Sequence, residues 1–354
     1  MLRTLIVGLG QAGWTLHLPV LTRLRASAST GELFSPEPIV VYDPGRVPAM
    51  TREDAPVVAG GLEEARELLD PETTVVHVCT PPSARVEPLR ELAALGFRKI
   101  LVEKPLASDP TGLAGVLGVC KAWDLEPVVV SHWLDSALTR RLSEIVRSGE
   151  LGALRSIRVV QRKPRFTRSL ATHGHPSAFE VEVPHSLGVA LRLAGEAVVE
   201  DAAWSDMEVG GRRIPRMGAA RLTLRHESGV RTEIHSVLTS LLRERRIVLR
   251  FERGQVTGYY PVSRDDDHAL MTVTANGRDE TSVFRDDSLA SFLERTYRGF
   301  ASGDGVTTHL DLNARLVELL SDAKRRCALE ERDAEDGNTV DGVSIKDKAV
   351  EYAN

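Results

Sequence analysis

Hydrophobic residues in the first 130 positions gather into short apolar runs that alternate with helix-like stretches. The runs predict strands over residues 2–7, 38–43, 74–79, 99–102 and 127–131. Helical patterns lie between them, over 14–26, 62–69, 84–95 and 109–123. Strands that alternate with helices are typical of βαβ units, so this half of the chain is predicted to form an α/β, doubly wound parallel sheet.

The pattern changes after about residue 155. Strand-like runs follow at 156–161, 219–226, 231–237, 247–251 and 255–260, with helical stretches at 136–148, 185–194, 288–301 and 310–327. The turn 227–229, Glu-Ser-Gly, separates two of the strands and favours a hairpin. This half therefore predicts an α+β domain with a large, open, mostly antiparallel sheet. One face should pack on helices, and the other is predicted to be partly apolar and to form an oligomer surface.

Composition and charge narrow the class of protein. The 354 residues are 42% hydrophobic with a formal net charge of −5, so a basic surface for nucleic acid is not expected. Three scattered cysteines argue against a disulfide framework or a zinc site. The apolar run at the start is too short for a signal peptide, and no stretch reaches the length of a membrane span. The expectation is a cytoplasmic protein without membrane or nucleic-acid partners.

The first candidate chemistry is the motif GxGxxG formed by Gly8, Gly10 and Gly13, with Gln11 and Ala12 inside it. It lies between a predicted strand and a predicted helix. In that setting the first glycine makes a tight turn, the second lets backbone N–H groups approach a pyrophosphate, and the third allows close packing of helix on strand. The alternative is an ordinary glycine-rich turn; the flanking elements favour a dinucleotide site.

Asp43 ends the second predicted strand. A carboxylate there accepts hydrogen bonds from both ribose hydroxyls of NAD and repels a 2′-phosphate. It follows Gly13 later than is usual, and the segment 26–38 is interpreted as an insertion that causes the delay. The neighbouring Arg46 tolerates a phosphate, so NADP stays open, but NAD is favoured. The alternative for Asp43 is a plain Asp-Pro turn.

Two further motifs follow strands of the same sheet. Cys79-Thr80-Pro81-Pro82 closes the third strand, and Glu103-Lys104-Pro105 closes the fourth. The carboxyl ends of parallel strands form the ligand crevice of a doubly wound sheet. Together with GxGxxG, these motifs resemble the glucose–fructose oxidoreductase / inositol dehydrogenase (Gfo/Idh/MocA) family of NAD(P)-dependent oxidoreductases, over nearly the whole chain.

The resemblance implies an N-terminal Rossmann domain over 1–130, with Thr80, Pro81 and Glu103 among its cofactor-binding residues. It implies a substrate-binding and oligomerisation domain over 131–327, followed by an acidic, frayed tail over 328–354. The Lys of the family's EKP motif contacts nicotinamide and the substrate hydroxyl, which falls on Lys104, and Pro105 resembles a cis-proline position. A homodimer or homotetramer through the C-terminal sheet is also implied.

A second family motif places a histidine at the start of a helix in the C-terminal domain, and His185 matches it. The usual acid three residues later is replaced by Gly188, and the family's histidine after the TP motif is replaced by Arg85. These departures affect substrate identity and the proton route rather than cofactor binding.

The chemistry of Lys104 and His185 also follows from first principles. Hydride transfer from a carbinol carbon requires a base for the hydroxyl proton, and histidine has a suitable pKa. A nearby lysine stabilises the developing alkoxide charge. We therefore expect Lys104 and His185 to be catalytic. The alternative for His185 is a helix-terminal residue satisfied by backbone groups.

Candidate substrate residues surround these two. Glu180 and Glu182 alternate, so in a strand both side chains point to one face, where carboxylates suit an amino sugar or aminocyclitol. The equally weighted alternative is a salt bridge with one of the basic residues between 162 and 168. Trp133 either stacks on a sugar or belongs to the core. The other candidates are His132, His173 and His175; for the last two, a substrate loop is favoured over a metal site, and no metal is expected.

The sequence thus predicts a sugar, amino-sugar or cyclitol dehydrogenase or ketoreductase that uses NAD or, less favoured, NADP. An aminoglycoside or sugar-antibiotic tailoring step fits the Arg- and Ala-rich composition. The alternative is a dinucleotide-binding transcriptional co-regulator of the same fold. A third option is an enzyme that keeps and recycles its bound cofactor.

Overall fold

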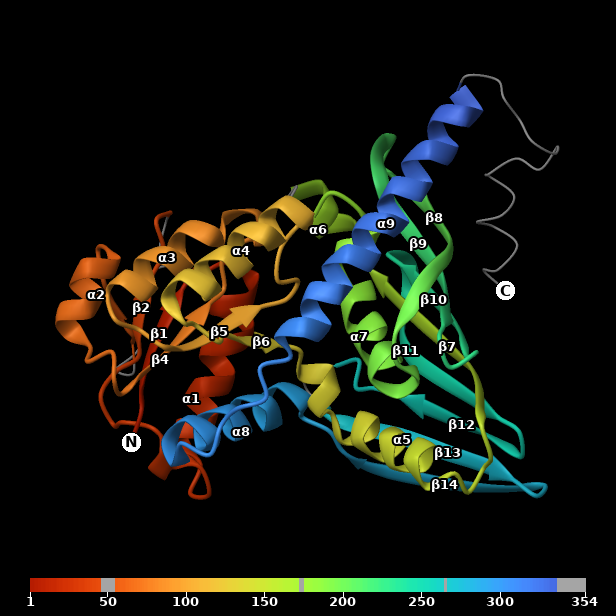
Figure 1. Ribbon diagram of the computed structural model, residues 1–354, viewed down its shortest axis with the longest axis horizontal. Helices are drawn as coiled ribbons and strands as arrows, with labels where there is room; N and C mark the ends of the chain where they lie inside the picture. Colours follow the sequence, from red (N-terminus) through yellow and green to blue (C-terminus); the bar gives the residue numbers. More distant parts are fainter. Residues whose placement is uncertain (46–54, 172–174, 264–265, 336–354) are drawn as a thin grey trace. The chain divides into compact units, whose positions relative to one another are not determined.

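The computed structural model describes residues 1–45, 55–171, 175–263 and 266–335, and divides into two compact units (Figure 1). Unit 1 consists of Met1–Asp135 and Ser288–Val317. Unit 2 consists of Ser136–Asp287 and the described residues from Glu318 onward. Among the helices described, none combines the length and the apolar character needed to cross a membrane.

Unit 1 is built on a six-stranded parallel sheet in the order β3-β2-β1-β4-β5-β6. Its strands are β1 (Arg3–Val7), β2 (Val40–Tyr42), β3 (Val57–Val58), β4 (Thr74–Val78), β5 (Lys99–Glu103) and β6 (Val128–Val130). Its helices are α1 (Leu18–Ala26), α2 (Leu62–Leu68), α3 (Val86–Ala94), α4 (Pro110–Trp123), α8 (Ser288–Ser302) and the start of α9 (Leu310–Glu335). Short helical turns are η1 (Gly13–His17), η2 (Gly31–Leu33), η3 (Pro82–Ala84) and η4 (His132–Asp135). The predicted doubly wound parallel sheet is confirmed.

Both faces of this sheet are buried, which explains why its strands are apolar without alternation. Successive residues of one strand enter opposite cores: Leu5 and Val7 face α2, α3 and α4, whereas Ile6 faces α1 and α8. Phe292 and Tyr297 of α8 belong to that second core and are fully buried. Residues 288–317, which the sequence analysis placed in the second domain, therefore complete unit 1.

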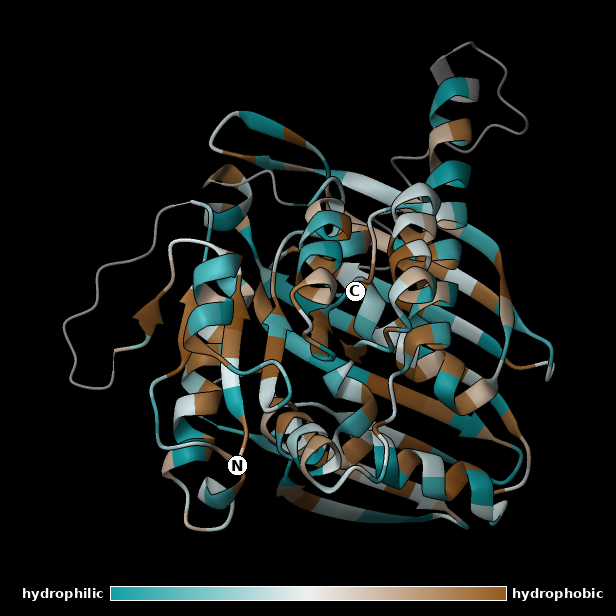
Figure 2. Ribbon diagram, turned by 60° about the vertical axis from the view of Figure 1, so that its left-hand side comes forward, coloured by the Kyte–Doolittle hydropathy of each residue, from teal (hydrophilic) through white to brown (hydrophobic). Residues whose placement is uncertain are grey.

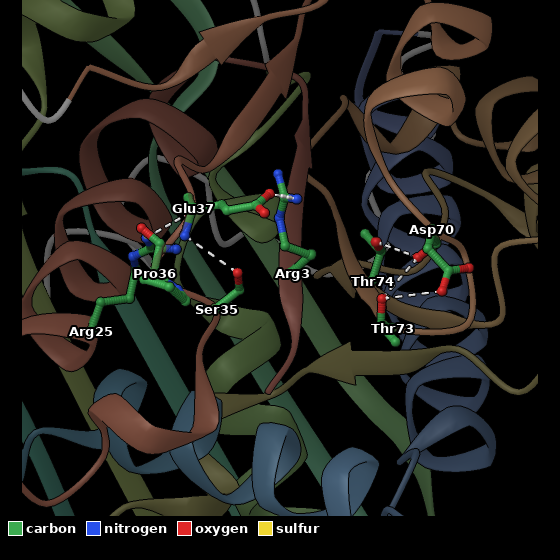
Figure 3. A network of polar contacts seen from close by, with 8 residues as sticks. All are labelled: Arg3, Arg25, Ser35, Pro36, Glu37, Asp70, Thr73 and Thr74. Atoms are coloured by element: carbon green, nitrogen blue, oxygen red, sulfur yellow. Dashed lines mark hydrogen bonds and ion pairs between the residues drawn. The ribbon is translucent and has the colours of Figure 1, made fainter.

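The segment between α1 and β2, interpreted from the sequence as an insertion, is fastened to the sheet by polar contacts (Figure 3). Arg25 donates to the carbonyls of Pro36 and Glu37, at 3.2 and 2.7 Å. The Glu37 carboxylate in turn forms an ion pair with Arg3 of β1. The insertion thus lengthens the chain before Asp43 while the second strand keeps its place beside the first.

Unit 2 is built on an eight-stranded sheet in the order β14-β13-β12-β11-β7-β10-β9-β8. Its strands are β7 (Leu154–Pro164), β8 (Ala197–Val209), β9 (Arg212–His226), β10 (Arg231–Val237), β11 (Thr239–Phe251), β12 (Gly254–Tyr259), β13 (His268–Ala275) and β14 (Arg278–Arg285). Its helices are α5 (Ala137–Ser148), α6 (Phe166–Ala171), α7 (Val183–Ala194) and most of α9, with the turn η5 (Ala178–Glu180). Among the described strands of this second sheet, only β7 and β10 pair in parallel, so the mostly antiparallel prediction is confirmed.

The long strands of this sheet carry alternating hydrophobic and hydrophilic bands (Figure 2). Ile157 and Val159 of β7 are buried, together with their partners Leu249 and Ile247 of β11, on the face that α7 covers. The opposite face carries many charged side chains beside apolar ones such as Val248 and Tyr259. A hollow of about 550 Å³ on it is lined by residues that include Arg158, Arg231, Glu233, Arg246 and Arg250.

One predicted boundary and three strands also differ from the sequence analysis. The predicted tail from residue 328 begins as helix, because α9 continues to Glu335; residues 336–354 lie outside the described part. Strands β8, β13 and β14 were not predicted. Several of their exposed positions are charged or small polar residues, which weakened the strand pattern.

Candidate functional site

The glycine motif forms the turn that leaves β1, and each of its glycines meets different surroundings. Gly8 has a φ of +95°, and an added Cβ would lie 2.9 Å from the backbone of both Cys79 and Thr80. An added Cβ at Gly13 would lie 2.0 Å from the Gly8 carbonyl oxygen. At Gly10 such an atom would meet nothing within 4 Å. The turn is thus packed at its two ends and open at its centre, the arrangement that a pyrophosphate requires.

The helix after this turn is irregular. Gln11 and Ala12 are helical, η1 is a five-residue π-helix from Gly13 to His17, and α1 continues from Leu18. The side chain of Gln11 donates to Thr15 Oγ1, which holds the exposed first turn. π-Turns inside helices often occur at functional sites, because the extra residue redirects side chains. Here the redirected end of the turn is the buried His17.

Asp43 follows β2 and contacts the glycine turn directly. One carboxylate oxygen accepts a hydrogen bond from the backbone N–H of Leu9, and the other accepts one from Gly45 at 2.7 Å. The hydrogen bond from Gly45 is the one expected for the alternative interpretation of Asp43 as part of an Asp-Pro turn. Each carboxylate oxygen has a further lone pair, so the same group retains the capacity to bind ribose hydroxyls.

Arg85 joins the TPP turn to the EKP turn. Its guanidinium donates to the carbonyls of Pro105 and Thr80, the latter at 3.2 Å. The side chain is 1% exposed, and burial lowers its pKa to about 10, so it remains a cation at neutral pH. The sequence analysis noted this arginine only as a departure from the family pattern. The structure shows that it fixes the two turns to each other.

The turn after β5 carries Glu103, Lys104 and Pro105. The Lys104–Pro105 peptide bond is cis, as the resemblance implied. Thr80, on the adjacent turn, is 9% exposed, and its hydroxyl lacks a hydrogen-bond partner within the described residues. An unpartnered buried hydroxyl beside an open glycine turn fits a polar ligand at the carboxyl edge of this sheet. Pro81 continues the same turn and precedes η3.

A chain of buried polar side chains lies beneath Glu103. His17 contacts the Glu103 carboxylate at 2.9 Å and the ring of His77 at 2.7 Å. His77 contacts the Tyr297 hydroxyl at 2.9 Å, and this hydroxyl contacts Thr4 at 2.7 Å. Sequence reasoning missed His17, His77 and Tyr297. The only available signal was two histidines in otherwise apolar segments, because their pairing depends on the tertiary fold.

In unit 2, the two candidate glutamates do not lie in a strand. Glu180 ends η5, where it forms a capping box with Ser177 and an ion pair with Lys324 at 2.7 Å. Glu182 is the N-cap residue of α7 and pairs with Lys163, with Arg245 at 3.6 Å. Both carboxylates are buried and matched by cations. The salt-bridge alternative is confirmed for Glu182, which pairs with Lys163, whereas Glu180 pairs with Lys324, outside the segment 162–168. A substrate role for either carboxylate stays a prediction.

His185 lies in the first turn of α7, three residues after Glu182. It is partly exposed, whereas its neighbours Pro184 and Ser186 are buried. The inner face of the sheet becomes polar at the end near Glu182, where Gln161 of β7 pairs with Ser236 of β10. Gln161 and Ser236 are each 1% exposed, and the polar atoms of their side chains have no hydrogen-bond partner among the described residues. These side chains can bind a hydroxyl group or a water molecule.

The remaining candidates are dispersed. His132 and Trp133 form the turn η4 of unit 1, and the Trp133 side chain is 5% exposed, which favours the core interpretation over sugar stacking. His175 is partly exposed in unit 2, and His173 lies outside the described residues. Lys104 belongs to unit 1 and His185 to unit 2, so their pairing stays a prediction.

Comparisons with known proteins agree with the first unit. Residues 2–125 match the model of an oxidoreductase family with an NAD-binding Rossmann fold, Gfo/Idh/MocA. No curated protein matches the chain.

Solved structures share the fold over nearly the whole length. A putative NADPH-dependent oxidoreductase from Desulfitobacterium hafniense is 14% identical, covers 93% of this chain and 96% of its own, and gives a TM-score of 0.75. A 3-ketoreductase from Actinomadura kijaniata, solved with NADP and TDP-benzene, is 15% identical over 92% and 98%, with a TM-score of 0.71. A UDP-N-acetylglucosamine 3-dehydrogenase from Acidithiobacillus ferrooxidans is 16% identical over 92% and 97%, with a TM-score of 0.69.

Proposed function

Because residues 2–125 match the Gfo/Idh/MocA family of oxidoreductases with an NAD-binding Rossmann fold, we propose that the chain is a member of this family and that it interconverts a secondary alcohol and a ketone on a sugar or cyclitol. The bound nicotinamide nucleotide supplies the hydride acceptor or donor. The chain's own residues bind the nucleotide, orient the substrate hydroxyl and move its proton. The same fold in a 3-ketoreductase solved with TDP-benzene and in a UDP-N-acetylglucosamine 3-dehydrogenase supports this substrate class.

One observation carries the proposal: three turns at the carboxyl ends of β1, β4 and β5 are locked together around an open glycine. Gly8 touches the backbone at Thr80, and Arg85 ties Thr80 to the turn that holds Lys104. A nucleotide bound over Gly10 therefore lies beside turns that cannot move independently. Fixed geometry of this kind places a catalytic group against a bound cofactor.

In the proposed reaction, Lys104 holds the substrate oxygen and stabilises negative charge that develops on it. His185 accepts the hydroxyl proton during oxidation and returns it during reduction. This division of roles requires His185 to be partly exposed, as it is, and Lys104 to follow a fixed turn.

NAD is the proposed cofactor, with NADP as the competitor. Asp43 supports NAD, because its carboxylate at the end of β2 repels a 2′-phosphate. The structural neighbours named with NADPH or NADP support NADP as the competitor. Calorimetric titration of nucleotide-free protein with NAD and with NADP distinguishes them, and tight NADP binding would contradict the role given to Asp43.

The proposed substrate is polyhydroxylated and need not be cationic, because Glu180 and Glu182 are already paired with lysines. An aminoglycoside step loses its structural support, although amino sugars belong in the screen. Free sugars, cyclitols and nucleotide-linked sugars should be tested in both reaction directions. Turnover confined to aminocyclitols would restore the amino-sugar interpretation.

The catalytic roles are tested with Lys104→Met and His185→Asn. Each variant should lower kcat by about 100-fold or more, because general acid–base groups contribute that much. NAD affinity should stay within about threefold of wild type for His185→Asn, which keeps every proposed nucleotide contact. Full activity in both variants would refute the proposal.

The competing function is a dinucleotide-binding transcriptional co-regulator. In that case no substrate in the screen turns over, and Lys104→Met leaves binding of the partner unchanged. A cofactor-recycling enzyme is recognised differently, because the purified protein carries nicotinamide absorbance before any nucleotide is added.

A homodimer or homotetramer through the large sheet is also part of the proposal. The exposed leucines at 241 and 242, which are 82% and 72% exposed, support a covered surface on β11. Sedimentation of the wild type and of Leu241→Ser tests it; a monomeric wild type would contradict it.

A further inference from the structure

Five polar side chains from five elements of unit 1 form one continuous hydrogen-bonded chain. It runs from Glu103 of β5 through His17 of η1, His77 of β4 and Tyr297 of α8 to Thr4 of β1. All four contacts are between 2.7 and 2.9 Å. The proposed reaction does not use this chain, yet its first member directly precedes Lys104.

The partners of each group limit how hydrogen can be arranged along the chain. A carboxylate only accepts, so His17 Nε2 donates to Glu103. The two Nδ1 atoms of His17 and His77 face each other, so one must carry hydrogen and the other must accept. With His17 as imidazolium, it donates on both sides. His77 is then neutral, and its Nε2 donates to Tyr297, whose hydroxyl donates to Thr4.

Charges around the pair agree with that assignment. Burial alone would lower the pKa of His17, but Cys79 and Glu103 together raise it. Burial and the charge of His17 lower the pKa of His77, which keeps it neutral. Burial opposes ionisation of Glu103 as well, and the contact with His17 outweighs it and lowers the pKa of that carboxyl. The groups that face this ion pair are His77, Cys79, Arg85, Lys104 and His132.

The chain ends inside the protein. Thr4, Tyr297, His77 and His17 are each no more than 1% exposed, so the far end offers no exit for a proton. A hydrogen-bonded chain that is closed to solvent at its far end cannot carry protons through the protein during turnover. The hydrogen-bonded chain instead keeps the charges of Glu103 and His17 in fixed positions.

We infer that His17, backed by His77 and Tyr297, is a positioning residue that keeps the Glu103 carboxylate charged and fixed in orientation beside Lys104. The inference rests on the proposed function. Glu103 attracts both Lys104 and His132, so a constant carboxylate keeps their electrostatic surroundings constant while a substrate proton moves. The π-turn explains the placement, because its wider Leu18-to-Gly13 hydrogen bond accommodates the extra residue just before α1.

The decisive variant is His17→Gln, which can still donate to Glu103 but carries no charge. We expect kcat to fall about tenfold to 100-fold, with NAD affinity within about threefold of wild type. Without the imidazolium, burial raises the pKa of Glu103, so the variant should lose further activity as pH falls from about 8 to about 6. The wild type should lack this additional loss of activity.

Two variants separate positioning from general damage. Glu103→Gln should lose activity to a similar extent without the additional loss at lower pH, and the double variant should lose no more than the larger single loss. Thr22→Ala, an exposed position on α1, should match wild type in rate and pH profile. A His17→Gln variant that lowers the rate equally at every pH would overturn the inference.

Nitrogen NMR of the histidine rings supplies a readout that does not depend on turnover. His17, assigned by its loss in His17→Gln, should carry hydrogen on both ring nitrogens at neutral pH, and should become neutral in Glu103→Gln. A neutral His17 in the wild type would overturn the inference. If Lys104→Met retains full turnover while His17 is an imidazolium, the proposed catalytic role fails and the charge assignment stands.

Discussion

At the scale of single residues, the three motif glycines have separate physical tasks. Gly8 and Gly13 are packed against backbone atoms, whereas Gly10 borders open space. The motif itself is readable from the sequence, since the spacing between a strand and a helix identifies it. The difference between the three positions is not readable there, because it depends on how closely β4 approaches the turn.

These tasks predict opposite outcomes for Gly10→Ala and Gly13→Ala. Gly10→Ala should leave thermal stability unchanged and weaken NAD binding by about tenfold or more, because its methyl group occupies the approach of the pyrophosphate. Gly13→Ala should destabilise the fold by about 3 kcal/mol, because its Cβ would lie 2.0 Å from the Gly8 carbonyl oxygen.

Calorimetry for binding and thermal melts for stability measure both effects. Gly10→Ala and Gly13→Ala serve as controls for each other, because each adds one methyl group to the same turn. If both variants lost stability and kept NAD affinity, the open centre of the turn would have no binding role.

Buried polar partners are the residue-scale feature that sequence reasoning could not supply. Arg85 and His17 stand in segments whose pattern is helical, and nothing near them in sequence reveals their partners Pro105 and Glu103. Glu103 was assigned to the nucleotide site through its neighbour Lys104. Its contact with a histidine 86 residues earlier requires the parallel sheet to be assembled first.

At the scale of elements, periodicity predicted most helices and strands, and one misassignment is instructive. The alternation of Glu180, Val181 and Glu182 suggested a strand, but the segment is a 3-10 turn that leads into α7. Ser177 and Glu180 have the S-x-x-E spacing of a capping box, which the structure confirms. That local signal outweighs an alternation of only three residues.

The N-terminus of α5 depends on one distant carboxylate. Asp286 accepts hydrogen bonds from Ser136 Oγ at 2.6 Å, from the Ala137 N–H at 2.7 Å and from the Leu138 N–H at 3.3 Å. It is 5% exposed. Asp286→Ala should therefore lower the free energy of unfolding by about 2 kcal/mol, since three donors at a helix start lose their acceptor.

Urea unfolding followed by circular dichroism measures this change. The matched control is Asp279→Ala, which removes a carboxylate bonded to Thr274 on the exposed hairpin of β13 and β14. Its effect should stay within about 0.5 kcal/mol. Equal losses in the two variants would show that the cap contributes no more than a surface contact.

At the scale of the whole molecule, the division into units does not follow the order of the sequence. The sequence predicted two consecutive domains and a tail, because the pattern of strands and helices changes after about residue 155. It could not show that α8 completes the first unit, since an amphipathic helix has the same pattern whichever core it joins. Phe292, Leu293 and Tyr297 reveal the assignment only through their burial in the core beside α1.

Phe292→Ala tests that assignment. The ring is fully buried, so its loss should destabilise unit 1 by about 3–5 kcal/mol. Hydrogen exchange should then accelerate in β1 and β4 and remain unchanged in β9 and β10. Faster exchange confined to the large sheet would contradict the division into units.

The chain passes between its units at three points: after Asp135, after Asp287 and after Val317. The third point lies inside α9, within an unbroken helix. Recombination that exchanged one unit between related genes would therefore need three breakpoints at once. The breakpoint inside α9 would also have to keep the residues of both halves on the same helix faces. Recombination rarely satisfies such a requirement, so the nucleotide-binding unit and the large-sheet unit should be inherited together. New specificities in this lineage should then arise by substitution within the units rather than by shuffling them.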